Sequence, residues 1–369
     1  MAIISENISR IEIESTQKIN RSMEIFYNPA MESHRNISIL LLNSIENERM
    51  NLADPLAGSG IRSIRFLQEL KRNKINHLFV NDKKENFTWM FKKNLQLNNL
   101  NLGRVSVYNE EASLFLLNRV NDQNKPLDFC GYFDYIEIDP FGSPNPFLSA
   151  AIARISRSGV LAVTATDTAA LTGTYPKTTF RKYWASNYFN YMMHELGLRI
   201  LIRKIQLQAL QFDKALTPIL AYFKDHYFRV YFRSGKGKSI CNELLKQHQY
   251  LLYNPKTLDW EISPHDCKPD YEAIGPLWIG KLQDKNLLKK MLDKNPFEKE
   301  TEFLKLLREE KEIPGFYDLH ALSKEYKIPT PKREIVLKKL NGTRTHFSST
   351  GIKTNKSLKE ILKLMTAGD

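Results

Sequence analysis

The fold is decided by the stretch Asn51-Leu52-Ala53-Asp54-Pro55-Leu56-Ala57-Gly58-Ser59-Gly60-Ile61-Arg62. A short apolar run ends at Asp54, two glycines follow, and apolar residues then recur at helical spacing. Glycine permits a sharp turn and a close approach of backbone to ligand, and the start of a helix presents free N–H groups. The stretch therefore predicts a strand, a tight turn and a helix that begins at Ile61. Two glycines alone are equally compatible with a purely structural turn.

Strands and helices alternate on the C-terminal side of this turn. Further strands are predicted at 78–82, 105–108, 132–138 and 159–166, and a helix is predicted through Phe87, Phe91 and Leu95. This alternation predicts an α/β fold in which mostly parallel strands are joined by right-handed crossovers. Ligands bind such sheets at the carboxyl ends of the strands. The acidic residues expected at that edge are Asp54, Asp82, Glu110, Glu111 and Asp139.

The flanking regions give weaker patterns. A short strand is predicted at 8–14 and a helix at 37–43, both before the turn. The length of 369 residues suits two domains. The run Gly235-Lys236-Gly237-Lys238-Ser239 has the composition of a flexible linker. We therefore predict one domain at 1–233 and a smaller C-terminal α+β domain at 240–369, with helices near 303–308 and 335–340.

The charge balance favours a polyanionic partner. Lys and Arg outnumber Asp and Glu by 54 to 41, a net charge of +13. The segment from Pro331 to Asp369 contains nine basic and three acidic residues, so this tail is either a solvated end or a binding arm. Three isolated cysteines and no signal or membrane-spanning pattern predict free thiols and a cytoplasmic location.

The spacing around the turn indicates the kind of cofactor. Asp82 stands 22 residues after Gly60, the offset expected for a carboxylate that binds ribose hydroxyls. Ser63 occupies the place of the third glycine of a pyrophosphate-binding motif. A nucleoside without pyrophosphate therefore fits better than NAD, and S-adenosyl-L-methionine is the common one. A dinucleotide-dependent oxidoreductase on a similar sheet is the first rival interpretation.

Asp139-Pro140-Phe141-Gly142 follows the fourth predicted strand of the alternating region. One interpretation is an Asp helix cap followed by Pro at the first helical position. The other is an amino-methylation site, because Asp139 and the Pro140 carbonyl could accept the N–H groups of an exocyclic amine. Phe141 offers a ring for stacking the base. Tyr27, in Phe26-Tyr27-Asn28-Pro29, either packs in a core or covers the other side of an extruded base.

Together these residues resemble the tRNA guanine-26 N2-dimethyltransferases, of the compact archaeal or bacterial type. The likeness extends over nearly the whole chain, in order. The motifs that carry it are Phe26 to Met31, Asp54 to Arg62, Asp139 to Pro144, Thr164 to Thr168, Gly173 to Pro176, His226 to Val230, Gly275 to Gly280, Thr345 to Phe347 and Ile352 to Thr354.

The resemblance implies a class I, Rossmann-like methyltransferase domain and a C-terminal domain peculiar to the family. It implies Asp139 as the catalytic carboxylate, with Tyr27, Pro140 and Phe141 binding the guanine. The residues expected to bind S-adenosyl-L-methionine are Arg35, Asp54, Gly58, Gly60, Arg62, Asp82, Glu111 and Ala112. One or two methyl groups would pass to guanine 26, and acceptance of guanine 27 stays open.

The chain departs from the family pattern at three places. His34-Arg35 stands where Asn-Arg is frequent, and Glu111 stands where Asp is common. Paired cysteines that could bind zinc in several members are replaced here by Tyr253-Asn254-Pro255 and a lone Cys267, so no metal is expected.

Transfer RNA is the expected partner, and no protein partner or membrane is indicated, so a monomer is expected. The basic residues considered for its phosphates are Lys332, Arg333, Lys338, Lys339, Arg344 and Lys353, each equally compatible with a solvated surface. The second rival interpretation is a non-catalytic RNA-binding protein that keeps the fold.

Overall fold

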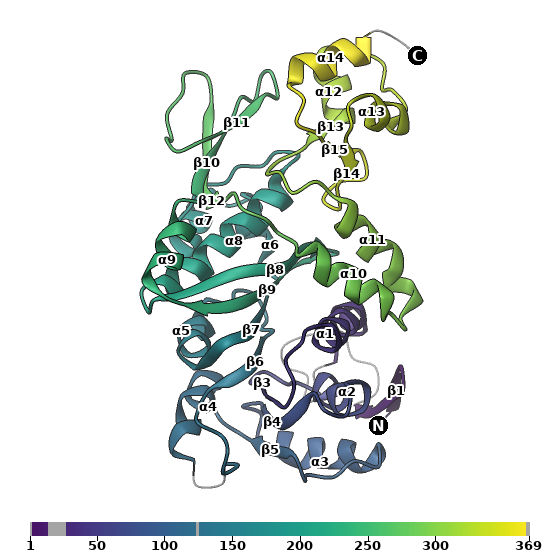
Figure 1. The fold of residues 1–369 in the computed structure, drawn as a ribbon. Coiled ribbons are helices and arrows are strands. Elements are labelled where there is room, and N and C mark those ends of the chain that lie inside the picture. Colours follow the sequence, from purple (N-terminus) through teal and green to yellow (C-terminus); the bar gives the residue numbers. More distant parts are fainter. Residues whose placement is uncertain (1, 14–26, 123–124, 367–369) are drawn as a thin grey trace. The chain divides into compact units, whose positions relative to one another are not determined.

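The computed structural model describes residues 2–13, 27–122 and 125–366 (Figure 1). These residues pack as two compact units. Unit 1 contains the described residues of 1–164, 231–235 and 289–301, and unit 2 contains those of 165–230, 236–288 and 302–369. The predicted boundary between domains at 233–240 stays a prediction. Glu14 and Phe26, which belong to two of the predicted motifs, lie outside the described residues.

A seven-stranded sheet has the order β5-β4-β3-β6-β7-β9-β8. The first five pair in parallel through β3–β4, β3–β6, β4–β5 and β6–β7. Two residues separate β8 from β9, so these neighbours form an antiparallel hairpin. The prediction of a mostly parallel α/β sheet is confirmed. The strands are β3 Met50–Asp54, β4 Ile75–Asn81, β5 Val105–Tyr108, β6 Phe133–Ile138, β7 Ile155–Ala165, β8 Lys214–Lys224 and β9 Tyr227–Lys236.

Helices alternate with these strands, as the sequence pattern predicts. Helix α2 begins at Ile61, the predicted residue, and buries Ile64 and Phe66 on its apolar face. The central strands are apolar along their length: Tyr135 to Ile138 of β6 and Gly159 to Ala165 of β7 are buried throughout. The helices up to β9 are α1 Glu32–Ser44, α2 Ile61–Glu69, α3 Phe87–Leu97, α4 Ala112–Asn118, α5 Asn145–Arg154, α6 Thr168–Leu171, α7 Pro176–Tyr183 and α8 Met193–Leu210.

The N-terminal strands form a small antiparallel sheet within unit 1. β1 (Ala2–Glu6) pairs with β2 (Ser9–Ile13), and Ile11 and Ile13 are buried. The predicted strand at 8–14 corresponds to β2, which begins one residue later than predicted because Ile8 lies in the turn after β1. Short 3-10 helices lie at η1 Pro29–Met31, η2 Arg119–Asn121 and η3 Glu298–Glu300.

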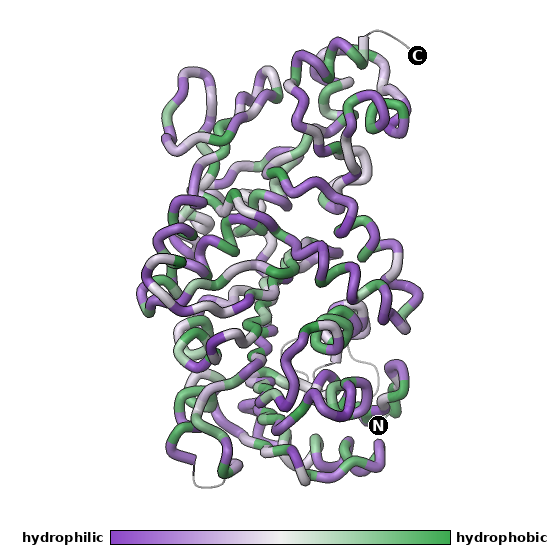
Figure 2. Tube along the Cα trace, in the orientation of Figure 1, coloured by the Kyte–Doolittle hydropathy of each residue, from purple (hydrophilic) through white to green (hydrophobic). Residues whose placement is uncertain are grey.

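Unit 2 adds two three-stranded sheets of order β11-β10-β12 and β13-β15-β14, whose pairings are antiparallel. In Figure 2, hydrophobic and hydrophilic residues alternate along α11, the pattern of a helix with one buried face. The mixture of helices and antiparallel sheets is the α+β composition predicted for this region. The elements are α9 Lys238–Leu245, β10 His248–Tyr253, β11 Trp260–Ser263, β12 Glu272–Trp278, α10 Lys285–Asp293, α11 Thr301–Glu309, β13 Tyr317–Asp318, α12 Leu319–Tyr326, α13 Arg333–Lys339, β14 Thr343–Arg344, β15 Gly351–Lys353 and α14 Leu358–Thr366.

The prediction of a linker at 235–239 is wrong. Gly235 and Lys236 continue β9, and α9 begins at Lys238. Gly237 alone makes the turn, with a φ of 145° that favours glycine. The glycines and lysines that resemble a linker therefore end a strand and start a helix. No helix among the described residues is long and apolar enough to cross a membrane.

Candidate active site

The glycine turn joins β3 to α2 and contacts the carboxylate that follows β4. Gly58 and Gly60 have φ values of 60° and 76°, and a Cβ at Gly60 would collide with the Phe91 ring. The Gly58 N–H donates to Asp82 Oδ2 at 2.8 Å, and the Lys84 N–H donates to Asp82 Oδ1 at 3.1 Å. The turn and Asp82 therefore lie together at the carboxyl edge of the parallel strands, with the N-terminus of α2 beside them.

Asp54 ends β3 and is buried beneath this turn. Its Oδ2 accepts a hydrogen bond from the Ser63 hydroxyl at 2.8 Å. Burial raises the pKa of Asp54 to about 7, against the opposing effects of Arg62 and the Ser63 hydrogen bond. Asp54 thus titrates near neutral pH at the base of the candidate cofactor site.

This pKa predicts a pH-dependent stability that Asp54→Asn removes. The carboxyl has a pKa of 3.8 when unperturbed and about 7 in the folded protein, so the folded state retains a proton that the unfolded chain releases. Stability is therefore lost as pH rises from about 4 to about 7. Between pH 5 and pH 8 we expect the wild type to lose about 3 kcal/mol relative to the variant, because one pKa unit is about 1.4 kcal/mol. Urea unfolding of both proteins at the two pH values measures this difference, and parallel pH profiles would contradict the assignment.

Asp139 follows β6 and does not cap the next helix. Helix α5 begins only at Asn145, with Pro144 at the capping position. Gly142 has a φ of 81°, which turns the chain between Asp139 and the helix. The helix-cap interpretation of Asp-Pro is therefore wrong. Pro140 is buried, whereas Phe141 is 44% exposed.

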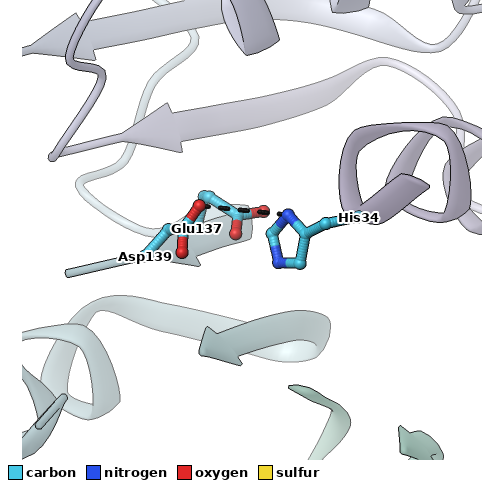
Figure 3. A group of neighbouring side chains, drawn as sticks. All are labelled: His34, Glu137 and Asp139. Atoms are coloured by element: carbon cyan, nitrogen blue, oxygen red, sulfur yellow. Dashed lines mark ion pairs between the residues drawn. The ribbon is translucent and has the colours of Figure 1, made fainter. Parts of the chain in front are cut away.

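Arg62, in the first turn of α2, connects the glycine turn to Asp139. Its guanidinium hydrogen-bonds Asp139 Oδ2 and lies 3.0 Å from His34 Nδ1 and 3.6 Å from Glu137 Oε2. Figure 3 shows Glu137 and Asp139 at the end of β6 facing the His34 ring on α1, with His34 Nδ1 3.9 Å from Asp139 Oδ2. The second ring nitrogen of His34 contacts the Thr164 hydroxyl at 2.9 Å. Asp139 is therefore held by a buried polar network at the strand edge.

His34, Glu137 and Asp139 also have the composition of a metal site, with ligand atoms within 4.8 Å of one another. The Arg62 guanidinium already places a positive charge among them, through its bonds to Asp139 and His34. A second cation at the same position would be repelled. The donor set therefore does not fit a divalent metal, and the absence of a metal stays a prediction.

Arg35 and Tyr27 contact a different carboxylate, Glu6. Arg35 makes a bidentate pair with Glu6 at 2.7 and 2.6 Å, and the Tyr27 hydroxyl donates to Glu6 Oε2 at 3.2 Å. Tyr27 is only 7% exposed, and the Arg35 guanidinium lies 5.4 Å from the centre of its ring. Burial opposes ionisation of Glu6, but Arg35 and Arg65 outweigh it and lower its pKa. Here Tyr27 packs in a core, the first of its two interpretations.

The acidic segment after β5 places Glu111 at the start of α4. Its carboxylate caps the helix by accepting the N–H groups of Ser113 and Leu114 at 2.8 and 3.0 Å. Glu111 is exposed and Ala112, the first helical residue, is buried. Glu110 instead pairs with Arg119 at 2.6 Å. Of the two neighbouring carboxylates, Glu111 is the one with an exposed position.

The sequence motifs do not predict His34, Glu137 and Thr164 as members of the Asp139 network. Glu137 had a detectable signal, because residues two apart on a strand share a face and a buried Glu in the run Tyr135-Ile136-Glu137-Ile138 requires a partner. His34 and Thr164 gave none, because their contacts join elements far apart in the chain.

The predicted phosphate-binding residues of unit 2 divide by exposure. Lys332, Lys338, Lys339 and Arg344 are exposed, and Arg333 is partly exposed. Lys353 is buried, and its Nζ binds both Glu195 oxygens at 2.8 Å and the Ile313 carbonyl at 2.7 Å. The prediction for Lys353 is therefore wrong, since a buried and paired ammonium cannot reach a phosphate.

Comparison with known proteins shows the family to which the chain belongs. The family model described as N2,N2-dimethylguanosine tRNA methyltransferase matches residues 7–366. The chain belongs to this family. It is 37% identical to the tRNA (guanine(26)-N(2)/guanine(27)-N(2))-dimethyltransferase of Aquifex aeolicus, covering 99% of this chain and 96% of that protein. It is 35% identical to the tRNA (guanine(26)-N(2))-dimethyltransferase of Methanobrevibacter smithii, covering 99% and 98%.

A solved structure of the same family has the same fold. Trm1 from Pyrococcus horikoshii, in complex with S-adenosyl-L-methionine, matches with a TM-score of 0.87 and 32% identity, covering 98% of this chain and 99% of that one. The predicted class I methyltransferase fold with an additional C-terminal region is thereby confirmed. The resemblance noted from the sequence motifs is confirmed as well. The roles of the individual site residues stay predictions.

Proposed function

We propose that this protein transfers one or two methyl groups from S-adenosyl-L-methionine to the exocyclic N2 amine of guanine 26 in tRNA. The observation that carries the proposal is the pairing of Arg62 with Asp139. It fixes the carboxylate after β6 beside the glycine turn, in a chain that belongs to a tRNA methyltransferase family. A methyl donor at the turn and a base at Asp139 would therefore be neighbours.

The cofactor supplies a methyl group already activated by the sulfonium. The residues at the turn fit a nucleoside: Asp82 lies against the Gly58 backbone, where a ribose is expected, and exposed Glu111 could accept from an adenine. Arg35 and Arg62 would face the carboxylate of S-adenosyl-L-methionine, although both guanidiniums are paired with protein carboxylates here. Asp54, Gly60 and Ala112 complete the proposed cofactor set.

Asp139 is proposed as the group that aligns and deprotonates the guanine amine. The lone pair of this amine is delocalised into the ring, so it is a weak nucleophile. Hydrogen bonds from N2 to the Asp139 carboxylate and the Pro140 carbonyl would direct the lone pair at the methyl group. As the N–C bond forms and the C–S bond breaks, the amine proton would pass to Asp139. Phe141, which is exposed, would stack on the base.

Tyr27 fits a second stacking role less well in this arrangement. Tyr27 is only 7% exposed, and its hydroxyl is hydrogen-bonded to Glu6. Stacking on a guanine would require the segment around Tyr27 to separate from Glu6. Phe141 is therefore the stronger of the two proposed base contacts.

Methyl transfer to unmodified tRNA tests the proposal. The purified protein is incubated with labelled S-adenosyl-L-methionine and an unmodified tRNA transcript, and the nucleosides are identified by mass spectrometry. We expect N2-methyl- or N2,N2-dimethylguanosine, lost when guanine 26 is replaced by adenine. A non-catalytic RNA-binding protein would give no product with any tRNA.

Cofactor binding to the same purified protein distinguishes a methyltransferase from a dinucleotide-dependent oxidoreductase. We expect S-adenosylhomocysteine to bind at micromolar concentration and NAD to bind at least about a hundredfold more weakly, because Ser63 replaces the third glycine of the pyrophosphate motif. Preference for NAD would overturn the cofactor assignment. Replacing guanine 27 in the transcript tests whether that position is also accepted.

The location and the oligomeric state stay predictions. A cytoplasmic location is compatible with a tRNA substrate and with three free cysteines, Cys130, Cys241 and Cys267. A monomer is the expected state.

A further inference from the structure

An unusual concentration of aromatic side chains lies on the surface of unit 2. Ten Phe, Tyr and Trp side chains are exposed in the described part of the chain, and five of them fall within fifteen residues. We define the aromatic surface as these five: Tyr175 (61% exposed), Phe180 (65%), Trp184 (49%), Tyr188 (38%) and Phe189 (74%). None of them belongs to the cofactor or Asp139 sites. Exposed aromatic rings gathered in this way mark a binding surface.

Helix α7 aligns aromatic and basic side chains on one face. Lys177, Phe180, Arg181 and Trp184 follow the i, i+3, i+4, i+7 spacing that places residues on one side of a helix. All four are exposed, whereas Thr179 and Tyr183 on the opposite side are buried. The exposed face of α7 therefore alternates rings with positive charges.

The flanking rings are brought to the same region by backbone packing. A Cβ at Gly173, whose φ is 79°, would lie 2.6 Å from the Asn187 carbonyl carbon and the Tyr188 nitrogen. The Asn187 side chain donates to the Leu171 carbonyl at 2.7 Å. The chain before Tyr175 thus packs directly against the chain that carries Tyr188 and Phe189. Ser186 is fixed in turn by two backbone hydrogen bonds to Gly275, at 2.7 and 2.8 Å.

Trp184 occupies a backbone conformation that favours glycine. It ends α7 with φ 56° and ψ 38°, the left-handed region that bulky side chains rarely adopt. The inner side of its ring is covered by Lys204, whose Nζ lies 2.8 Å from the ring centre, and Arg203 donates to the Trp184 carbonyl at 3.0 Å. Burial and the neighbouring Arg203 lower the pKa of Lys204 to about 8. A strained residue held in this way points to a function for the exposed ring.

The charge of the surface selects the class of partner. From residue 168 to residue 194 the sequence has Lys177, Arg181 and Lys182 and no Asp or Glu, and Lys182 pairs with Asp167 at 3.4 Å, just before this segment. A second copy bound through the same face would bring Lys177 and Arg181 of both copies together, and this segment has no carboxylate to pair them. An RNA strand has both of the complementary groups, phosphates for the cations and base faces for the rings.

We propose that the aromatic surface binds unstacked bases of tRNA, with Lys177 and Arg181 on the neighbouring phosphates. The proposal rests on the proposed function, and it adds a tRNA-binding surface separate from the basic residues near the C-terminus. Loss of one stacked ring typically weakens binding about tenfold. Phosphate contacts add a salt dependence that rings do not.

Equilibrium binding of an unmodified tRNA transcript tests the proposal with variants that keep the fold. Phe180→Ala removes an exposed ring, and Trp184→Gly removes a ring while placing the preferred residue at positive φ. We expect each to raise the Kd for tRNA about tenfold, with kcat at saturating tRNA and the Kd for S-adenosylhomocysteine within twofold of wild type. Phe212→Ala, which removes a ring 46% exposed in the turn after α8, is the matched control and should leave the Kd unchanged.

The salt dependence separates stacking from charge. Arg181→Gln should reduce the slope of log Kd against log salt by about one unit, whereas the slope of Phe180→Ala and Trp184→Gly should equal that of wild type. An unchanged tRNA Kd in both ring variants would overturn the proposal.

Two further measurements test whether the aromatic surface binds a membrane or a second copy of the chain instead of tRNA. If the ring variants lose binding to anionic lipid vesicles, or lose a dimer seen by sedimentation, while tRNA affinity is unchanged, the surface serves a membrane or a second copy and the proposal is wrong. Because binding is measured without methyl transfer, its outcome is distinct from that of the proposed function. That function fails instead if the wild type forms no methylated guanosine.

Discussion

Replacing Asp139 by Ala is expected to reduce methyl transfer to tRNA about a thousandfold. The carboxylate is proposed to align the guanine amine and to accept its proton, and positioned proton acceptors typically contribute a factor of 10²–10⁴. Asp139→Asn retains one hydrogen-bond acceptor but loses the negative charge, so we expect a residual rate above that of the alanine variant. Single-turnover transfer from labelled cofactor, with tRNA saturating, measures both.

The control for this prediction lies on the same strand. Asp134→Asn changes a carboxylate of β6 whose Oδ2 accepts the Asn51 N–H at 3.0 Å, before the strand reaches the site. Its turnover should be within about threefold of wild type. The Kd for S-adenosylhomocysteine should also remain within about threefold in the Asp139 variants. Normal turnover in Asp139→Ala would show that another group activates the amine.

Replacing Glu195 by Gln is expected to destabilise unit 2 by about 3–5 kcal/mol. Glu195 is fully buried on α8 and pairs with two buried cations, Lys353 at 2.8 Å and Arg199 at 2.8 Å, and accepts the Gly315 N–H at 3.0 Å. Removing one charge from a buried network leaves its partners desolvated and incompletely paired. The free energy of unfolding from urea denaturation measures the loss.

A compensating change distinguishes this explanation from a general intolerance of the position. The double variant Glu195→Gln with Lys353→Met removes the stranded ammonium, so it should be more stable than Glu195→Gln alone. A matched surface pair is Lys268 with Glu261, 2.7 Å apart and partly exposed, where Glu261→Gln should cause a much smaller loss because solvent screens the pair. Equal losses at the two sites would contradict the role given to burial.

The local patterns predicted much of the methyltransferase fold. The glycine turn predicted the start of α2 at Ile61, and apolar runs predicted the buried strands β6 and β7. These predictions succeed because backbone conformation near a glycine and the alternation of strands with helices are determined over short stretches of chain. The prediction of a linker at 235–239 is wrong because this run has no local preference for one conformation. Its glycines and charged residues suit a linker, a strand end and a helix start alike, and packing selects between them.

The site was predicted only in part. Asp82 and Gly58 were expected near one another because both follow parallel strands, and their hydrogen bond shows that proximity. The pairing of Arg62 with Asp139 has no sequence signal, because the two residues are 77 positions apart and meet only in the folded chain. The sequence is compatible with Tyr27 in a core or against a base, and in the structure its hydrogen bond to Glu6 and its burial place it in a core.

The sequence by itself determined the order of strands and helices, the turn at Gly58 and Gly60, and the family, because these depend on local stereochemistry and on motifs read in order. The tertiary structure decided which charges meet. Lys353 has the same appearance in the sequence as the exposed Lys338, yet it is buried against Glu195, 158 residues away. Whether a charge binds solvent, phosphate or a buried carboxylate depends on what packs around it, and only the folded chain contains that information.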